Sequence, residues 1–358
     1  TWSGEIELTG DVIVEAGNTL TLAAGTVVRA RALVDDRMGG EDTSRIELIV
    51  RGNLVTQGDL MSPVAFLSTR PIPEPRDWFG VRFESTSDAT FNDLDWTIVV
   101  AGWHGIEFRN TFAAMNEVTS EENYAHGLYV SSSDAAFPPS PTIFGGSFSN
   151  NGTYGIYLRS IDKTWLLEDV EIGHNGSYGM YVYACANDGP LTIDGAEIHD
   201  NGSRGVHLYN CSRPINLLRS TLDGKTGTGF YANYGDPAII RANTFSNQTG
   251  AGLVLSYPTE IVLSKNTFTG NGTNASISDS AGETRVVFNE FGAWTDAGDE
   301  GLEFAGGSAA TFRSVHFNNF REYAPAAADV MLRNAVSSSV NGRVNYWDPD
   351  TTAEMGAG

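Results

Sequence analysis

A column of ring-bearing side chains is the feature of this sequence with the clearest chemical potential. Its members recur in steps of 24 to 28 positions, and they are Tyr129, Tyr157, Tyr181, His207 and Tyr231. Two positions after four of them stand Arg159, Tyr183, Tyr209 and Asn233. Rings in a row suit an extended ligand such as a polysaccharide, because sugar faces stack on rings while hydroxyl groups take hydrogen bonds from neighbouring polar groups. The alternative is that like side chains on adjacent strands only stabilise a sheet.

An enzymatic role for the same residues is a second hypothesis. A lyase acting on a uronic-acid polymer needs a base for the proton beside the carboxylate and a positive charge that stabilises the enolate. Arg159, Tyr183 and His207 carry side chains suited to these roles. Hydrolysis would need two carboxylates about 5 to 10 Å apart across one groove. Glu171 and Glu197 have the spacing of stacked surface neighbours rather than of such a pair.

Residues 34–45 interrupt the strand-like alternation, and we predict an excursion loop there. Four acids lie in this segment, namely Asp35, Asp36, Glu41 and Asp42. Clustered carboxylates are what Ca²⁺ prefers, so these four are candidate ligands. Their spacing is not that of an EF-hand, and a solvated loop is the alternative. We predict no other cofactor.

Charge and hydropathy exclude several classes of function. Asp and Glu number 44 against 22 Lys and Arg, which gives a formal net charge of −22. A phosphate-binding surface needs clustered basic residues, so we expect no nucleic-acid partner. The sequence contains no run of about 18 apolar residues, and we therefore expect no insertion into a membrane.

A repeat of about 25 residues organises these chemical groups. Its marker is a glycine, replaced once by serine, at Gly80, Gly105, Gly127, Gly155, Gly179, Gly205, Gly229, Gly252, Ser276 and Gly301. An apolar residue follows one position later in all ten coils and three positions later in nine of the ten, which is the alternation of a strand with one inward face. A second apolar column is formed by Ile172, Ile198, Leu222, Phe245, Phe268, Phe291 and Phe317. We predict an all-β solenoid of about 12 to 14 coils, in which stacking buries what one coil alone could not.

The repeat resembles a known family. Asn-Gly turns followed by Gly-apolar-x-apolar strands, as in 151–158 and 175–182, are similar to the repeat of the pectin-lyase-like superfamily. The opening residues 1–30 and the segment 77–83 look like the first coils of bacterial secreted members. The resemblance implies a single-stranded right-handed parallel β-helix. It does not imply one activity, since that fold hosts enzymes, tailspikes and adhesins. Residues 102–105 resemble the Gly-His-Gly of polygalacturonases, but the motifs that accompany it there are absent.

The two cysteines test the register of the repeat. Cys185 lies six residues after Gly179, and Cys211 lies six after Gly205. The repeat therefore places them at one position of adjacent coils, about 4.8 Å apart between Cα atoms, which a disulfide accepts. A disulfide would fit an extracellular location, and two stacked thiols are the alternative.

We predict one parallel β-helix domain over residues 1–358, as a fragment of a larger protein. The expectation of a larger protein rests on the C-terminal coil, since an uncapped solenoid end is an open sheet edge that favours end-to-end or flanking-domain contacts. The leading functional hypothesis is a non-catalytic extracellular or cell-surface domain that presents a carbohydrate- or surface-binding face. A polysaccharide lyase using the same face is the alternative, and a purely structural spacer is the third.

Overall fold

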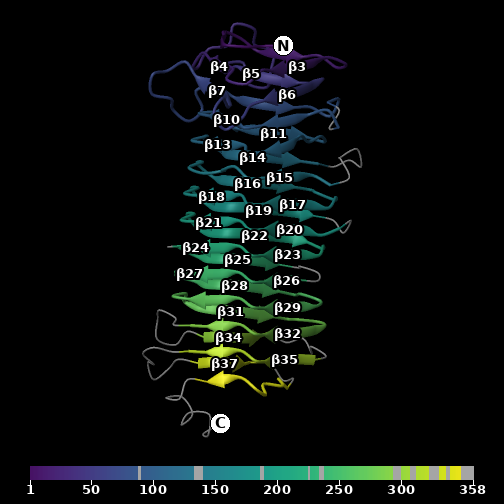
Figure 1. Ribbon diagram of the computed structural model, residues 1–358, viewed down its shortest axis with the longest axis vertical. Helices are drawn as coiled ribbons and strands as arrows, with labels where there is room; N and C mark the ends of the chain where they lie inside the picture. The colour runs from purple at the N-terminus through teal and green to yellow at the C-terminus, as the bar shows by residue number, and fades with distance from the viewer. Residues whose placement is uncertain are drawn as a thin grey trace. The chain divides into compact units, whose positions relative to one another are not determined.

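The computed structural model of the chain consists of β-strands joined by turns, without a helix in the part that it describes. The described residues are 1–87, 90–132, 140–185, 189–224, 226–233, 238–292, 300–306, 312–321, 330–335 and 339–347. The chain divides into two compact units, which we call the N-terminal unit, Thr1–Gly189, and the C-terminal unit, Pro190–Gly358. In both, successive coils of the chain lay parallel strands side by side (Figure 1).

The N-terminal unit contains three parallel sheets. The longest follows the order β2 (Val12–Val14), β5 (Glu47–Val50), β8 (Gly80–Phe83), β11 (Ile106–Arg109), β14 (His126–Ser131), β16 (Tyr154–Arg159) and β19 (Tyr178–Cys185). The second runs β3 (Thr19–Leu22), β6 (Asn53–Gln57), β9 (Asp93–Asp95), β12 (Ala114–Asn116), β15 (Thr142–Phe144) and β17 (Trp165–Glu168). The third runs β1 (Glu5–Leu8), β4 (Val27–Ala30), β7 (Val64–Ser68), β10 (Thr97–Val100) and β13 (Thr119–Glu121), and β18 (Glu171–Gly173) follows at the same corner of the repeat.

The C-terminal unit repeats the same three-sided arrangement. One sheet contains β22 (Arg204–Cys211), β25 (Thr228–Asn233), β28 (Ala251–Ser256), β31 (Thr273–Ser278), β34 (Glu300–Ala305) and β37 (Val330–Asn334). A second contains β20 (Leu191–Asp194), β23 (Ile215–Leu218), β26 (Ala238–Arg241), β29 (Ile261–Ser264), β32 (Glu283–Val287) and β35 (Phe312–His316). The third contains β21 (Glu197–His199), β24 (Thr221–Asp223), β27 (Thr244–Ser246), β30 (Thr267–Thr269), β33 (Glu290–Phe291), β36 (Asn319–Phe320) and β38 (Tyr346–Trp347).

The predicted inward face of the repeat is confirmed by burial. The residues one position after the repeat glycines are at most 2% exposed in the N-terminal unit, and they are Val81, Ile106, Leu128, Ile156 and Met180. The glycine itself is needed because the coils pack closely. A Cβ built on Gly155 would lie 2.6 Å from the Phe148 carbonyl oxygen and 2.7 Å from Ile172 Cγ2. The alternation of the sequence is thus the alternation of the strand.

Two positions of the predicted repeat were wrong. Leu253 pairs with Ala275, so Asn274 and not Ser276 stands at the glycine position of that coil. The register slipped by two residues there because both choices keep the same strand face inward. In the second apolar column Phe320 takes the place expected for Phe317: it stacks on Phe291 at 4.8 Å, while Phe317 is 54% exposed.

Buried asparagines hold the corners of successive coils together. In the N-terminal unit Asn151 donates from its backbone to Asn175 Oδ1 at 3.0 Å, as Asn123 does to Asn151 at 3.2 Å. These corner asparagines thus bond to the equivalent asparagine of the next coil. Such ladders satisfy backbone groups that no strand reaches.

No helix in the described residues is long and apolar enough to span a membrane. The long sheets have seven strands in one unit and six in the other, in agreement with the predicted number of coils. That the two units act as one domain stays a prediction.

Candidate functional site

Seven rings form two adjacent columns on the outer surface of the longest N-terminal sheet. One column contains His104, His126, Tyr154 and Tyr178, and the other contains Tyr129, Tyr157 and Tyr181; we call both together the ring ladder. Neighbouring rings within a column lie 4.9 to 5.3 Å apart between centroids. Rings of different columns also touch, as Tyr154 and Tyr157 do edge to face at 5.5 Å.

The strand register explains why these rings line up. Tyr129 pairs with Tyr157, and Tyr157 with Tyr181, because each stands two residues after its repeat glycine on an outward position. The other column consists of the residue immediately before the glycine, as at Tyr154 and Tyr178. Residues one strand spacing apart must stack when the same side-chain type recurs in each coil.

The rings of the ladder turn their faces to one another. The planes of Tyr154 and Tyr178 differ by 1°, and those of His126 and Tyr154 by 3°. Because the faces are covered by neighbouring rings, the ladder offers a ligand its ring edges and hydroxyl groups. Arg159 is exposed beside it and forms a side-chain hydrogen bond with Tyr129 that raises the pKa of the guanidinium. The surface is therefore better suited to hydrogen bonding along a chain of hydroxyls than to face-on stacking of sugars.

The two histidines of the ladder are neutral at physiological pH. Burial lowers the pKa of His104 to about 4, and the nearby Arg109 lowers it further. Burial also lowers the pKa of His126 to about 3, with a smaller contribution from His104. The Nδ1 atoms of both rings are buried without a hydrogen-bond partner. A pKa far below physiological pH makes each imidazole a weak base, so the two rings contribute to the ladder as neutral, stacked groups.

A cluster of buried charges lies next to the ladder on the same sheet; we call it the arginine cluster. Arg82 and Glu47 side chains are 5% and 0% exposed, and Arg82 Nη2 lies 2.5 Å from Glu47 Oε2. Arg109 donates from Nε to Glu107 Oε1 at 2.7 Å and from Nη2 to Glu41 Oε2 at 2.7 Å. Buried ions require such partners, since removing a lone charge from water costs several kcal/mol.

The carboxyl groups of this cluster are shifted in opposite directions. Burial raises the pKa of Glu107 despite the neighbouring Arg109, and burial likewise raises the pKa of Glu47. The hydrogen bond from Arg109 lowers the pKa of Glu41. Glu107 Oε2 is buried without a partner. Carboxyl groups whose pKa values are pushed apart are typical of functional sites, although structural ion pairs also produce such shifts.

Comparison with protein-family models shows what this architecture is. The model of the right-handed β-helix region matches residues 79–245 and 134–291, which together cover more than half of the chain. The chain belongs to this family. The predicted right-handed parallel β-helix is thereby confirmed. No curated protein matches the sequence.

Solved structures share the fold of this β-helix at low identity. A mannuronic acid specific polysaccharide family 6 lyase from human gut microbiota aligns with a TM-score of 0.50 at 13% identity, over 94% of this chain and 93% of the other. Tailspike protein 2 of Escherichia coli O157:H7 bacteriophage CAB120 gives 0.45 at 13%, over 90% and 39%. A mannuronan C-5 epimerase module of Azotobacter vinelandii gives 0.37 at 15%, over 94% and 91%. At these identities the likeness concerns the fold alone.

The predicted ligand-binding residues fall into the two units of the β-helix. Tyr129, Tyr157, Tyr181, Tyr183 and Arg159 lie on the N-terminal sheet, where Tyr183 approaches Tyr181 at 6.2 Å. The others belong to the C-terminal unit, and they are His207, Tyr209, Tyr231 and Asn233. The proposed catalytic trio of Arg159, Tyr183 and His207 is thus distributed over both units and stays a prediction.

In the C-terminal unit, Arg204 organises the predicted residues. Its guanidinium lies 4.1 Å from the centre of the Tyr231 ring, and Nη1 lies 2.9 Å from His207 Nε2. Burial, followed by the charge of Arg204, lowers the pKa of His207 to about 4. Tyr209 is 44% exposed and meets His207 edge to face at 6.2 Å. His207 is therefore a neutral, largely covered imidazole rather than an exposed cation.

The predicted excursion loop lies between β4 and β5 and is fastened by acidic side chains. Asp35 Oδ1 accepts hydrogen bonds from the backbone of Asp11 and Arg37 at 3.1 and 2.9 Å. Asp42 forms an ion pair with Arg45, and Glu41 forms one with Arg109. Of the four candidate Ca²⁺ ligands, these three thus have protein partners, while Asp36 is exposed. The Ca²⁺ site stays a prediction.

The cysteines keep the positions that the repeat gives them. Cys185 ends β19 in the N-terminal unit and is 3% exposed, and Cys211 ends β22 in the C-terminal unit and is 0% exposed. Their pairing stays a prediction.

Sequence reasoning missed the second column of the ladder and the arginine cluster. The signal for the column was present, since the residue before the repeat glycine is His104, His126, Tyr154 and Tyr178 in four successive coils. The cluster had a weaker signal. Arg82 and Glu107 occupy the outward position that Tyr129 holds in the next coil, but a charge on an outward position is ordinarily solvent-exposed.

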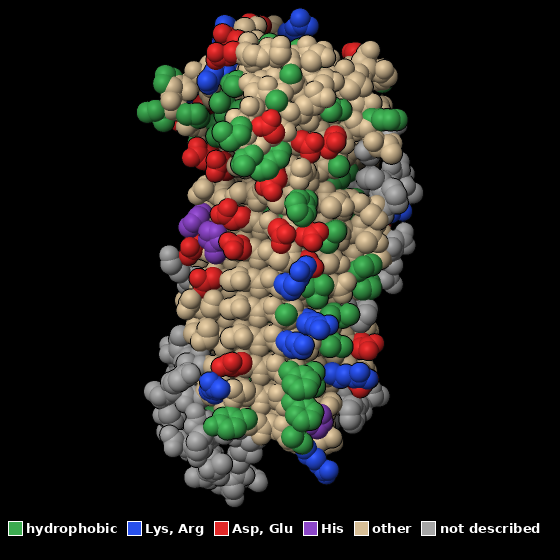
Figure 2. Space-filling view, in the orientation of Figure 1, with side chains coloured by type: hydrophobic (Ala, Val, Ile, Leu, Met, Phe, Trp, Pro, Cys, Tyr) green, Lys and Arg blue, Asp and Glu red, His purple; other side chains and the backbone are tan. Residues whose placement is uncertain are grey.

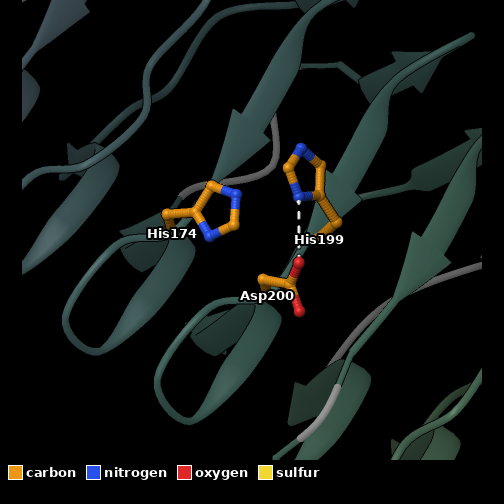
Figure 3. A group of neighbouring side chains, drawn as sticks. All are labelled: His174, His199 and Asp200. Atoms are coloured by element: carbon orange, nitrogen blue, oxygen red, sulfur yellow. Dashed lines mark ion pairs between the residues drawn. The ribbon is translucent and has the colours of Figure 1, made fainter.

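Two further features lie at the corners of the C-terminal unit. Several residues with a left-handed backbone conformation carry first basic and then hydrophobic side chains, and they are Arg219, Lys265, Phe288 and Phe317. Figure 2 shows basic and hydrophobic side chains in neighbouring stretches of one face. His199 Nδ1 lies 3.6 Å from Asp200 Oδ2 (Figure 3). His174, drawn in the same figure, belongs to the N-terminal unit.

Proposed function

We propose that this β-helix binds a carbohydrate polymer along the ring ladder of its N-terminal unit. The observation that carries the proposal is the ladder itself: seven half-buried rings on neighbouring strands, with tyrosine hydroxyls and the exposed Arg159 along its border. The column of the ladder that runs from His104 to Tyr178 crosses four coils, so its ends lie about 14 Å apart. An extended ligand with many hydroxyl groups fits such a row, whereas a compact ligand would require a pocket.

The fold supports this proposal. The solved lyase at TM-score 0.50 is described as specific for mannuronic acid polysaccharide, so a parallel β-helix of this size can present a polysaccharide site. We also propose an extracellular or cell-surface location, because that is where a polymer of this kind would be met. A role as a rigid spacer remains the outcome to expect if no polymer binds.

The experiment compares retention in polysaccharide-containing native gels. We expect the double substitution Tyr154→Ala and Tyr157→Ala to reduce affinity for the bound polymer about tenfold, since it removes two neighbouring rings and their hydroxyl groups. Tyr124→Ala is the matched control, because Tyr124 is a 43% exposed ring of the same unit that packs on Trp103 outside the ladder. Unchanged retention of the double variant, with wild-type circular dichroism, would place the binding site elsewhere.

Catalysis by elimination is the second candidate function. It is favoured by one arrangement, the exposed Arg159 guanidinium that is hydrogen-bonded to the Tyr129 side chain. A positive charge that stabilises the enolate, beside a hydroxyl group that exchanges the proton, is what removal of a proton next to a carboxylate requires. Incubation with uronic-acid polymers, with and without Ca²⁺, should then give ultraviolet absorbance from a new double bond. A polymer that is bound but chemically unchanged after prolonged incubation would exclude elimination, and binding would be the function of the ladder.

A further inference from the structure

We propose that Arg82 and Arg109 form a subsite for the carboxylate of an acidic sugar, and that Glu41 occupies this subsite while no polymer is bound. The inference rests on the proposed function, because it names the class of polymer that the ring ladder receives, a uronic-acid polysaccharide. It also assigns a role to the excursion loop, which has no role in the binding proposal alone.

The Glu41 carboxylate is held as a bound carboxylate would be. Both of its oxygens meet the Arg109 guanidinium, with Oε2 accepting from Nη2 at 2.7 Å and Oε1 facing Nη1. Oε1 also lies 3.4 Å from Arg82 Nη1. Two parallel contacts between a planar guanidinium and a carboxylate give the strongest and most specific recognition of this group. The same geometry accepts the carboxylate of a uronic acid.

The arginines are positioned independently of Glu41. Arg82 is fixed by Glu47 at 2.5 Å and by Glu84 at 3.2 Å, and Arg109 is fixed by Glu107 at 2.6 Å. Their side chains are 5% and 33% exposed, whereas that of Glu41 is 45% exposed. The occupant is thus the most accessible member of the cluster. Replacing it by a substrate carboxylate leaves the net charge of the cluster unchanged.

The cluster also has unused hydrogen-bonding capacity. Arg82 Nε and Glu107 Oε2 are buried without a partner in the described residues. Buried polar atoms are usually satisfied, and exceptions gather where a ligand or strain is involved. A sugar that enters with its carboxylate and hydroxyl groups brings both acceptors and donors to this position.

The subsite continues the ring ladder. Arg82 pairs with Glu107, and Glu107 with Tyr129, so that all three share one outward column of the sheet. Arg82 is therefore two coils, or about 10 Å, beyond the first tyrosine of that column. A polymer lying along the ladder reaches the arginines without a change of direction.

The loop that carries Glu41 is anchored by its backbone rather than by this side chain. Glu47 Oε1 accepts hydrogen bonds from the backbone N–H groups of Glu41 and Asp42 at 2.5 and 2.8 Å, and Asp11 Oδ2 accepts one from Gly39 at 2.8 Å. The Glu41 side chain can turn away while these contacts persist. A tethered carboxylate of this kind competes with the ligand at a high effective concentration.

The test is calorimetric titration of the full chain with oligomannuronate and oligogalacturonate, and with a neutral cello-oligosaccharide. We expect Glu41→Gln to lower the Kd for an acidic oligosaccharide about tenfold, because the competing charge is gone, and to leave the neutral ligand unaffected. Glu5→Gln is the matched control, since Glu5 is 68% exposed and pairs with Arg29 at 2.6 Å away from the cluster. It should change the Kd less than twofold.

Arg109→Lys completes the design, because it keeps the charge and loses the bidentate geometry. It should weaken acidic-ligand binding both in the wild type and in Glu41→Gln. The melting temperature checks that each variant folds. An unchanged or raised Kd for Glu41→Gln, with wild-type binding still lost in the Tyr154 and Tyr157 double variant, would overturn the subsite and leave the proposed function standing. Absence of any binding by the wild type and by Glu41→Gln would overturn both.

Discussion

His126 illustrates how a single buried residue ties stability to pH. In the folded protein its pKa is about 3, against 6.5 for the free side chain, because burial disfavours the charged ring. At a pH between these two pKa values, His126 therefore binds a proton in the unfolded chain but not in the folded chain. A group of this kind destabilises the fold progressively as the pH falls below 6.5.

The corresponding prediction is that His126→Phe flattens the acid side of the stability profile. At pH 5 the wild type should have lost about 2 kcal/mol relative to pH 7 through this residue, at 1.36 kcal/mol for each pH unit below 6.5. Phenylalanine keeps the ring stacked on Tyr154 and removes the titration. Urea unfolding at several pH values measures the effect. Tyr154→Phe is the control and should keep the wild-type slope. An equal slope in His126→Phe would show that folding does not lower the pKa of His126.

Residue types on outward positions were only partly readable from the sequence. The tyrosine column could be predicted because one ring type recurs at one position of the repeat. Arg82 and Glu107 share that column, yet their burial depends on the excursion loop that brings Glu41 to them, a contact 41 residues away in the case of Arg82. Contacts that depend on an irregular loop carry no period, and pattern reasoning does not detect them.

At the scale of the element, asparagine ladders replace strand pairing at the corners of the coils. Asn266 is 1% exposed, and its Oδ1 accepts from the backbone of Asn243 at 3.0 Å. Its Nδ2 donates to the Ile240 carbonyl and to Asn289 Oδ1, both at 2.9 Å. Each rung satisfies groups of the coils before and after it, so the ladder is a continuous element rather than a set of separate turns.

We predict that Asn266→Ala destabilises the C-terminal unit by about 2 to 4 kcal/mol, because it leaves buried backbone groups of two coils without partners. Asn216→Ala is the matched control: Asn216 donates to Thr192 on the outer surface at 3.1 Å and should cost less than 1 kcal/mol. The midpoint of urea unfolding reports the difference. Equal midpoints for the two variants would mean that water replaces the rung.

The inward face of the strands requires apolar side chains. Leu158 is 0% exposed on β16, so Leu158→Asp places a charge where no partner exists and should prevent folding or cause aggregation. Ser131→Asp, on the outer surface of the neighbouring strand β14, should fold as the wild type does. Melting followed by circular dichroism distinguishes them. A Leu158→Asp protein with the wild-type melting temperature would refute the assignment of this strand face.

On the scale of the whole molecule, the repeat determines the fold and the departures from the repeat provide the chemistry. The period of about 25 residues predicts the strands, their register and the buried columns. It was wrong at Ser276, where two registers keep the same strand face inward. It was also wrong at Phe317, where the nearby Phe320 takes the buried position. The candidate site lies where outward residues break the ordinary polar pattern. A repeat alone does not say which of its faces binds a ligand.

The central claim is that a carbohydrate polymer lies along the ring ladder, and side-chain footprinting tests it directly. A polysaccharide retained in the gel assay is added, exposed side chains are labelled with a carbene reagent, and the modified residues are quantified by mass spectrometry. We predict that polymer protects Tyr154, Tyr157 and Arg159, while Tyr257 of the C-terminal unit, 47% exposed, is labelled as before. Unchanged labelling of Tyr154, Tyr157 and Arg159 at saturating polymer would contradict the account.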